Sequence, residues 1–99
     1  MFLVRDTMYC KPGKVRPMVD KFLALRKISQ QKGLGTFRVM TDLTAERFWM
    51  VVVETEVASM DDYEANMRKS MESKELQDAM KDYHDLVDHG RREIYRIEG

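Results

Sequence analysis

Arg47-Phe48-Trp49-Met50-Val51-Val52-Val53-Glu54-Thr55 holds the longest apolar run of the chain, six large apolar side chains from Phe48 to Val53. A strand with one face in water alternates apolar and polar residues, so an unbroken run predicts a strand covered on both faces. Three valines and two aromatic rings favour a strand over a helix. We therefore expect this segment in the middle of a sheet, with helices on one face and a second copy of the protein on the other.

The rest of the chain alternates between strand and helix patterns. The predicted order is strand, helix, strand, strand, helix, strand, over residues 2–9, 14–31, 36–42, 47–57, 59–89 and 92–98. With right-handed crossovers this order predicts a ferredoxin-like βαββαβ sandwich, an α+β fold. Its four-stranded antiparallel sheet has the strand order 4-1-3-2, with two helices on one face. No linker or repeat divides the chain, so we treat residues 1–99 as one domain.

Local signals set the ends of the two predicted helices. Pro17 is tolerated only in a first turn, which places the start of the first helix near Lys14, and Gly33 is a natural stop. In the second helix the apolar spacing slips at residues 70–73, which predicts a bend or break there. We expect this helix to end at His89 and Gly90.

The predicted hairpin between the second and third strands assigns each side chain to a face. A turn centred on residues 43–46 pairs residues 38, 40 and 42 with 51, 49 and 47 on one face. Residues 37, 39 and 41 then pair with 52, 50 and 48 on the other face, which is the more apolar, and we assign it to the helices. The first face, with Met40, Trp49 and Val51, is left for a homodimer in which two sheets pack together.

Composition limits the function classes. The chain is 43% hydrophobic and 34% charged, with 17 basic and 17 acidic residues, which is typical of a soluble folded domain. It has no basic stripe with interleaved aromatic residues, so we expect no nucleic-acid partner. No apolar run is long enough to span a membrane, and the first residues do not resemble a signal peptide, so we expect a cytoplasmic protein. Cys10 is the only cysteine, which excludes an intrachain disulfide.

Two stretches resemble a known group of proteins. The segment Tyr9-Cys10-Lys11-Pro12-Gly13-Lys14 looks like the lysine-proline-glycine-lysine turn of the dimeric α+β barrel superfamily. The hairpin that leads through Glu54-Thr55-Glu56-Val57-Ala58-Ser59-Met60 into an acidic, interrupted helix resembles the same group. Its antibiotic-biosynthesis-monooxygenase-like and NIPSNAP-like families are the most similar.

The resemblance implies a homodimer with a pocket in each subunit, between sheet and helices. Members of the superfamily include cofactor-independent monooxygenases, isomerases, haem-degrading enzymes and small proteins of unassigned function, so the fold does not specify a reaction. Haem-degrading members carry an asparagine on the first strand, and residues 2–9 contain none. Neither His84 nor His89 has further ligands at metal-binding spacing. We therefore expect no metal and no cofactor.

The candidate ligand-binding residues are apolar or aromatic and come from several predicted elements. They are Met8, Phe37, Met50, Tyr63, Met67 and Tyr83. Nine methionines are many for 99 residues, and methionine adapts to irregular space and varied apolar guests. Methionines at helical spacing are also an ordinary core filling, and this alternative stays open.

Asp6 and His84 are the candidate catalytic residues. Asp6 lies in a predicted buried strand, where a carboxylate is costly unless it is paired. Facing the helices it would serve as a base with a raised pKa, and beside an arginine it would be structural. His84 would reach the pocket rim as an acid or base, or remain an ordinary helix histidine.

Two functions follow from these patterns. The first is a small protein that binds an apolar or aromatic molecule between sheet and helices. The second is a cofactor-independent monooxygenase or isomerase that acts on a similar molecule. Titratable groups that point into the cavity favour catalysis, and their absence favours binding.

Overall fold

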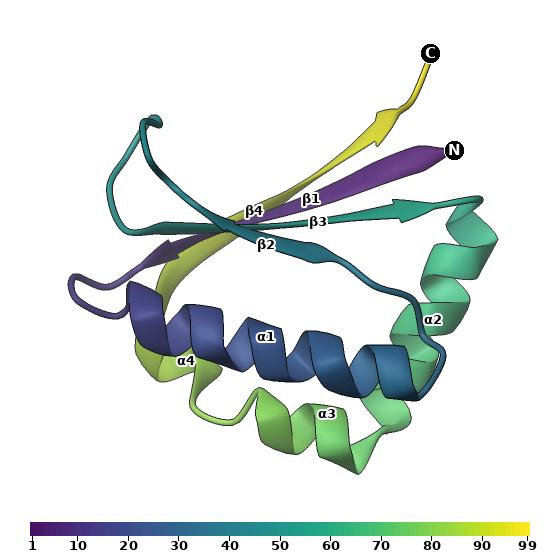
Figure 1. Cartoon of the computed structure of the whole chain (residues 1–99), viewed down its shortest axis with the longest axis horizontal. Coiled ribbons are helices and arrows are strands. Elements are labelled where there is room, and N and C mark those ends of the chain that lie inside the picture. The colour runs from purple at the N-terminus through teal and green to yellow at the C-terminus, as the bar shows by residue number, and fades with distance from the viewer.

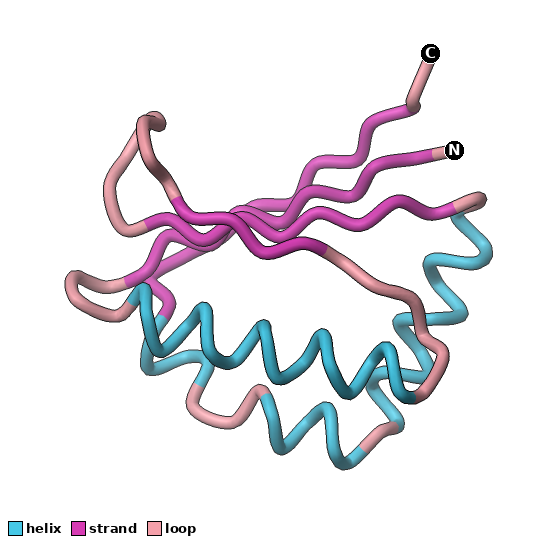
Figure 2. Tube along the Cα trace, in the orientation of Figure 1, coloured by secondary structure: helices cyan, strands magenta, loops and turns pink.

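A computed structural model describes all 99 residues and contains one four-stranded antiparallel sheet in the order β2-β3-β1-β4 (Figure 1). The elements are β1 (Phe2–Cys10), α1 (Val15–Gln31), β2 (Arg38–Thr41), β3 (Met50–Val57), α2 (Met60–Glu72), α3 (Lys74–Ala79), α4 (Tyr83–Leu86) and β4 (Val87–Arg96). All the helices lie on one side of the sheet, as Figure 2 shows. The predicted α+β ferredoxin-like fold and strand order are confirmed.

The predicted central strand is confirmed from Met50 onward, where β3 pairs with both β1 and β2. The residues before Met50 do not belong to the strand. Trp49 takes a φ of 64°, in the left-handed region that ends regular strand geometry. Phe48 is 83% exposed, so the first part of the apolar run lies outside the sheet. The prediction that the strand begins at Arg47 is wrong.

The predicted hairpin register is also wrong, by three residues. Met40 pairs with Val52 instead of Trp49. The Asp42 side chain accepts a hydrogen bond from the Met50 backbone N–H at 3.1 Å, so pairing resumes only after a longer loop than residues 43–46. An odd shift exchanges the two faces of a strand. Val51 therefore faces the helices, and neither Val51 nor Trp49 lies where the dimer prediction placed it.

The hydrophobic core joins the helix-facing side of the sheet to α1. Its buried members are Met8, Cys10, Met18, Val19, Phe22, Val51, Val53 and Leu86. The predicted bounds of α1 are confirmed to within one residue, and Gly33 takes the positive φ of 70° expected after a helix end. Burial raises the pKa of the Cys10 thiol. No helix has the length and apolar content that crossing a membrane requires.

The predicted second helix is divided. Ser59 Oγ accepts a hydrogen bond from the Asp62 N–H at 3.1 Å at the start of α2, and Ser73 Oγ accepts one from the Leu76 N–H at 3.4 Å at the start of α3. Because Ser73 has an extended conformation, the two helices are separate, and the predicted break is confirmed.

The prediction of a helix as far as His89 is wrong, as is a last strand that starts at Arg92. The left-handed φ of 67° at Asp82 interrupts the helical path, and β4 begins at Val87. There β4 pairs along almost the whole of β1, with His89 opposite Tyr9. The rings of these two residues stack with centroids 4.5 Å apart. Strand pairing thus replaces the expected end of the helix.

Candidate functional site

A cavity of about 720 Å³ lies between the sheet and the helices. It is lined by 26 residues, of which 14 are hydrophobic. They come from β1, β3 and β4, from α1, α2, α3 and α4, and from the segment before β2. Every layer of the fold therefore contributes to its wall.

The path of α2 explains why this space exists. Figure 1 shows α2 running steeply away from the end of β3 before the chain turns into α3. No residue of α2 is fully buried, so the helix does not pack closely on the sheet. The break at Ser73 lets α3 turn back along α1. Imperfect packing of this kind leaves room for a ligand.

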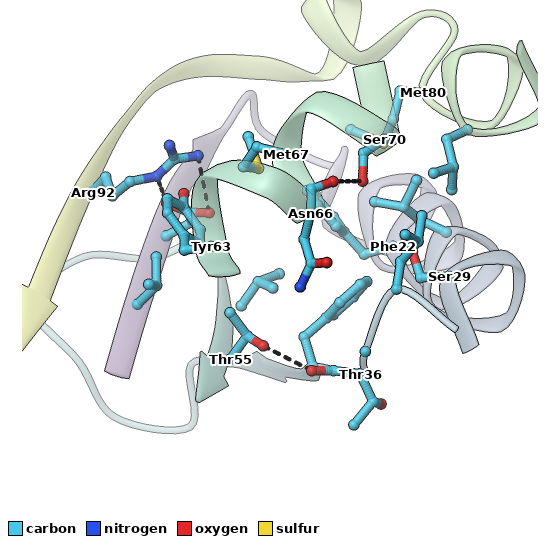
Figure 3. A pocket seen from close by; sticks show the side chains of 18 of the residues that line it. Phe22, Ser29, Thr36, Thr55, Tyr63, Asn66, Met67, Ser70, Met80 and Arg92 are labelled. Atoms are coloured by element: carbon cyan, nitrogen blue, oxygen red, sulfur yellow. Dashed lines mark hydrogen bonds and ion pairs between the residues drawn. The ribbon is translucent and has the colours of Figure 1, made fainter. Parts of the chain in front are cut away.

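The apolar wall is made mainly of flexible and aromatic side chains. Figure 3 shows Phe22, Met67 and Met80 around the space, and Met8, Met71 and Phe37 also line it. Five of the six residues predicted to bind a ligand are brought together here: Met8, Phe37, Tyr63, Met67 and Tyr83. Met50 is not among the lining residues, because the register places it on the opposite face of the sheet. Its assignment to the pocket is wrong.

An ion pair closes one part of the cavity. Asp6 and Arg92 face each other across β1 and β4, and both line the space. Arg92 Nε donates to Asp6 Oδ1 at 2.5 Å, and Arg92 Nη2 donates to Oδ2 at 3.3 Å. The hydrogen bond to Asp6 raises the pKa of the Arg92 guanidinium. Asp6 thus faces the helices, and its pairing with an arginine is the structural alternative that the sequence left open.

Two tyrosines lie near this pair. Burial raises the pKa of Tyr63, and Asp6 raises it further while Arg92 opposes the shift. Burial and the Asp6 charge likewise raise the pKa of Tyr83. The Arg92 guanidinium lies 5.7 Å from the centre of the Tyr63 ring. The Tyr63 hydroxyl is buried and has no hydrogen-bond partner, which is rare for a polar group away from water.

Asn66 and Arg92 were missed by the sequence analysis. Asn66 lies one turn after Tyr63 on α2, and Figure 3 shows its carboxamide projecting into the space. The Ser70 hydroxyl donates to the Asn66 backbone carbonyl at 2.9 Å, a bond that does not involve the carboxamide. The sequence pattern alone does not indicate that a polar residue such as Asn66 on a predicted helix faces inward. Arg92 was recognisable only with the correct pairing of the first and last strands.

His84 does not take the position predicted at the pocket rim. It is exposed on α4 and is not among the lining residues. Its ring meets the Tyr83 ring edge-on, with centroids 5.3 Å apart. The early end of α3 and the turn before α4 change the direction in which this residue points from the one expected for a continuous helix. Of the two candidate catalytic residues, only Asp6 reaches the cavity.

No protein-family model and no curated protein sequence matches the chain. A solved NIPSNAP family protein from Agrobacterium tumefaciens is 15% identical over 98% of this chain and 92% of its own, with a TM-score of 0.84. An uncharacterized NIPSNAP-like domain protein from Burkholderia xenovorans is 16% identical over 98% and 85%, with a TM-score of 0.80. A protein named antibiotic biosynthesis monooxygenase is 11% identical over 100% of both chains, with a TM-score of 0.74. At these identities the likeness shows a shared fold.

Proposed function

We propose that this chain, which has the ferredoxin-like dimeric α+β barrel fold shared by NIPSNAP and antibiotic-biosynthesis-monooxygenase-like proteins, binds an apolar or aromatic small molecule between its sheet and helices. The observation that carries the proposal is the cavity of about 720 Å³ with its mainly hydrophobic lining. Ligand pockets in proteins commonly have volumes of roughly 300–1,000 Å³, apolar walls and a few placed polar groups.

The side chains of the wall suit guests of varied shape. Four methionines line the cavity, at positions 8, 67, 71 and 80, and their unbranched side chains adapt to irregular surfaces. The polar groups of the wall include the Asp6–Arg92 pair and the tyrosines beside it. Because both Asp6 oxygens already accept hydrogen bonds from Arg92, the carboxylate is engaged as a structural partner. This arrangement favours binding over catalysis.

Filling the cavity tests the proposal. Met67 is 36% exposed on α2 and lines the space, so Met67→Trp should occupy part of it and leave the fold intact. We expect wild type to be stabilised in thermal unfolding by a long-chain fatty acid or an aromatic polyketide-like probe, and Met67→Trp to lose the shift. Leu23→Trp, on α1 and outside the lining, is the matched control and should keep it. Equal shifts in wild type and Met67→Trp with every probe would refute pocket binding.

A cofactor-independent monooxygenase or isomerase is the second candidate, and the position of Asp6 in the cavity is the observation that favours it. A base there would take a proton from an activated carbon of the substrate. An isomerase returns that proton to another carbon. A monooxygenase converts a CH₂ group and O₂ into a carbonyl group and water. Either reaction requires the Asp6–Arg92 pair to open.

Oxygen uptake with an anthrone probe, whose activated CH₂ group suits this chemistry, tests the second candidate. If Asp6 is the base, Asp6→Asn should lower the rate by at least about 100-fold, the low end of what a general base contributes. His84→Gln should have the wild-type rate, because His84 lies outside the cavity. A rate in wild type no higher than that without protein rejects anthrone oxidation, and an active Asp6→Asn variant rejects the role of the carboxylate.

We also propose a homodimer through the open face, defined as the side of the sheet away from the helices. Leu3, Met40, Val52 and Tyr95 lie on this face, and no helix covers them. Its buried charge is already paired within the chain: Glu54 accepts from Arg5 Nε at 2.6 Å and from Arg38 Nη2 at 2.9 Å. Isologous packing of two such faces would shield the apolar residues, with Glu54 already paired within each chain.

Val52→Lys tests the proposed dimer. It puts a charge on the open face, so sedimentation should show a folded monomer where wild type is a dimer. The exposed residue Leu23 on α1 provides the control, because Leu23→Lys should sediment as wild type. A wild-type monomer at all concentrations would refute the proposed interface.

A cytoplasmic location stays a prediction from the sequence.

A further inference from the structure

Tyr63 is the residue of the cavity wall whose hydrogen bonding is incomplete. Its hydroxyl oxygen is buried without a partner, although its ring forms part of the cavity wall. A buried hydroxyl without a hydrogen bond is unfavourable by about 1–3 kcal/mol. The oxygen has less than 1 Å² of accessible surface, so a ligand in the cavity pairs with it when the Tyr63 side chain, which lines the cavity, turns toward the ligand.

The hydroxyl acts as a donor. Burial raises the pKa of Tyr63, so the group keeps its proton at neutral pH. The protonated hydroxyl can both accept and donate, and we take donation of its one hydrogen to a ligand oxygen as the pairing to test. Asn66, one helical turn away, presents a carboxamide to the same space and offers a second polar contact.

The charges near Tyr63 exclude a charged partner. Arg92 and Asp6 neutralise each other through two hydrogen bonds. Because the pair has no net charge, it provides no free counter-charge, and a ligand carboxylate or ammonium group would lose its hydration without full compensation. Of the 26 lining residues 14 are hydrophobic, a composition that suits an apolar ligand better than a polyhydroxylated compound.

Taking these observations together, we infer that the ligand is an uncharged, mainly apolar compound with a carbonyl oxygen that accepts a hydrogen bond from Tyr63. This inference rests on the proposed binding function and narrows its ligand class. The apolar body lies against the methionines, and the carbonyl end lies toward α2 and the Asp6–Arg92 pair.

Three naphthalene probes test the inference. The ketone 2-acetylnaphthalene and the hydrocarbon 2-ethylnaphthalene match in size, and 2-naphthoate adds a charge. Kd values are measured for wild type, Tyr63→Phe and Tyr95→Phe. Removing the Tyr63 hydroxyl should weaken ketone binding relative to hydrocarbon binding by about 3- to 10-fold, the range of a neutral hydrogen bond. Tyr95→Phe is the matched control, because Tyr95 lies outside the cavity lining and its hydroxyl donates to Glu93 at 2.7 Å, and it should leave the ratio unchanged.

The outcomes separate this inference from the proposed function. If the hydrocarbon binds but the ratio is the same in wild type and Tyr63→Phe, the carbonyl inference fails and apolar binding stands. If 2-naphthoate binds more tightly than the ketone, the uncharged class is wrong. If no probe binds, both proposals fail.

A second measurement needs only wild type and tests the inference even if the Tyr63→Phe variant does not fold. Isotope-edited infrared spectra of carbonyl-labelled 2-acetylnaphthalene report hydrogen bonding directly. The bound carbonyl stretch should lie below its position in hexane, near its position in an alcohol. A bound stretch at the hexane position would overturn the inference.

Discussion

Tyr63→Phe should make the ligand-free protein more stable. The substitution removes one oxygen and keeps the ring, and that oxygen is buried without a hydrogen bond. Most substitutions in a folded protein destabilise it, by about 0.5–3 kcal/mol. A gain in stability here would therefore be specific evidence for an unpaired hydroxyl.

The magnitude follows from two opposing contributions. Removing the unpaired hydroxyl recovers about 1–3 kcal/mol of desolvation free energy. The void left by one oxygen, at about 24 cal/mol per Å³, costs a few tenths of a kcal/mol. The net gain is about 1–2 kcal/mol, which corresponds to a rise in Tm of roughly 4–15 °C for a domain of this size.

Urea unfolding of ligand-free protein at neutral pH measures this difference. Tyr95→Phe is the control, because it makes the same chemical change at an exposed hydroxyl that donates to Glu93 at 2.7 Å, and it should bring no gain. A Tyr63→Phe midpoint below that of wild type would show that the hydroxyl has a partner in solution, and the reasoning would be refuted. Saturating 2-acetylnaphthalene should reduce the difference in unfolding free energy between Tyr63→Phe and wild type, because only wild type gains the new hydrogen bond to the ketone.

Three further variants test the fold. Val51→Ala should lower the free energy of unfolding in urea by about 2–3 kcal/mol, because it removes two methyl groups from a fully buried site. In dilute protein, a smaller loss of stability for Val51→Ala than for Val52→Ala would contradict the register. Burial raises the pKa of Glu54, but Arg5 and Arg38 outweigh this effect and hold the pKa below its ordinary value. The ionised Glu54 therefore stabilises the fold fully above about pH 4.3, and this stabilisation is lost as the pH falls through the pKa of Glu54 in the folded state. Unfolding curves of Glu54→Gln should accordingly depend less on pH below about 5, and a dependence equal to that of wild type would reject this account. Ser73→Ala should lose about 0.5–2 kcal/mol through the missing cap of α3, whereas the nearby exposed change Lys74→Ala should not, as thermal unfolding would show.

The order of the elements was predictable because each rests on a local pattern. The stripe on α1, the turn at Gly33 and the serine caps act within a few residues of themselves. The hairpin register was not predictable in this way. It depends on the left-handed backbone of Trp49, a conformation that an indole side chain seldom adopts. A symmetric tight turn was the simplest expectation, and it was wrong by an odd number of residues.

The same error explains which part of the site was found. Met8, Phe37 and Met67 were identified because apolar residues at strand and helix spacing face inward whatever the exact pairing. Met50 was misplaced because its face depends on the register. Arg92 was missed because an arginine in an expected edge strand is ordinarily solvated, and only its position opposite Asp6 draws it into the cavity.

The break at Ser73 connects the fold to the site. Without it, α2 and α3 would form one continuous helix free to lie along the sheet and fill the space with its own side chains. With it, α2 contributes no fully buried residue, and the inward face of its first two turns lines a cavity. That face carries Tyr63 and Asn66, polar groups that a closed core would have to pair or replace. Their presence at the wall of an apolar cavity is the pattern expected where a sequence departs from optimal packing in favour of binding.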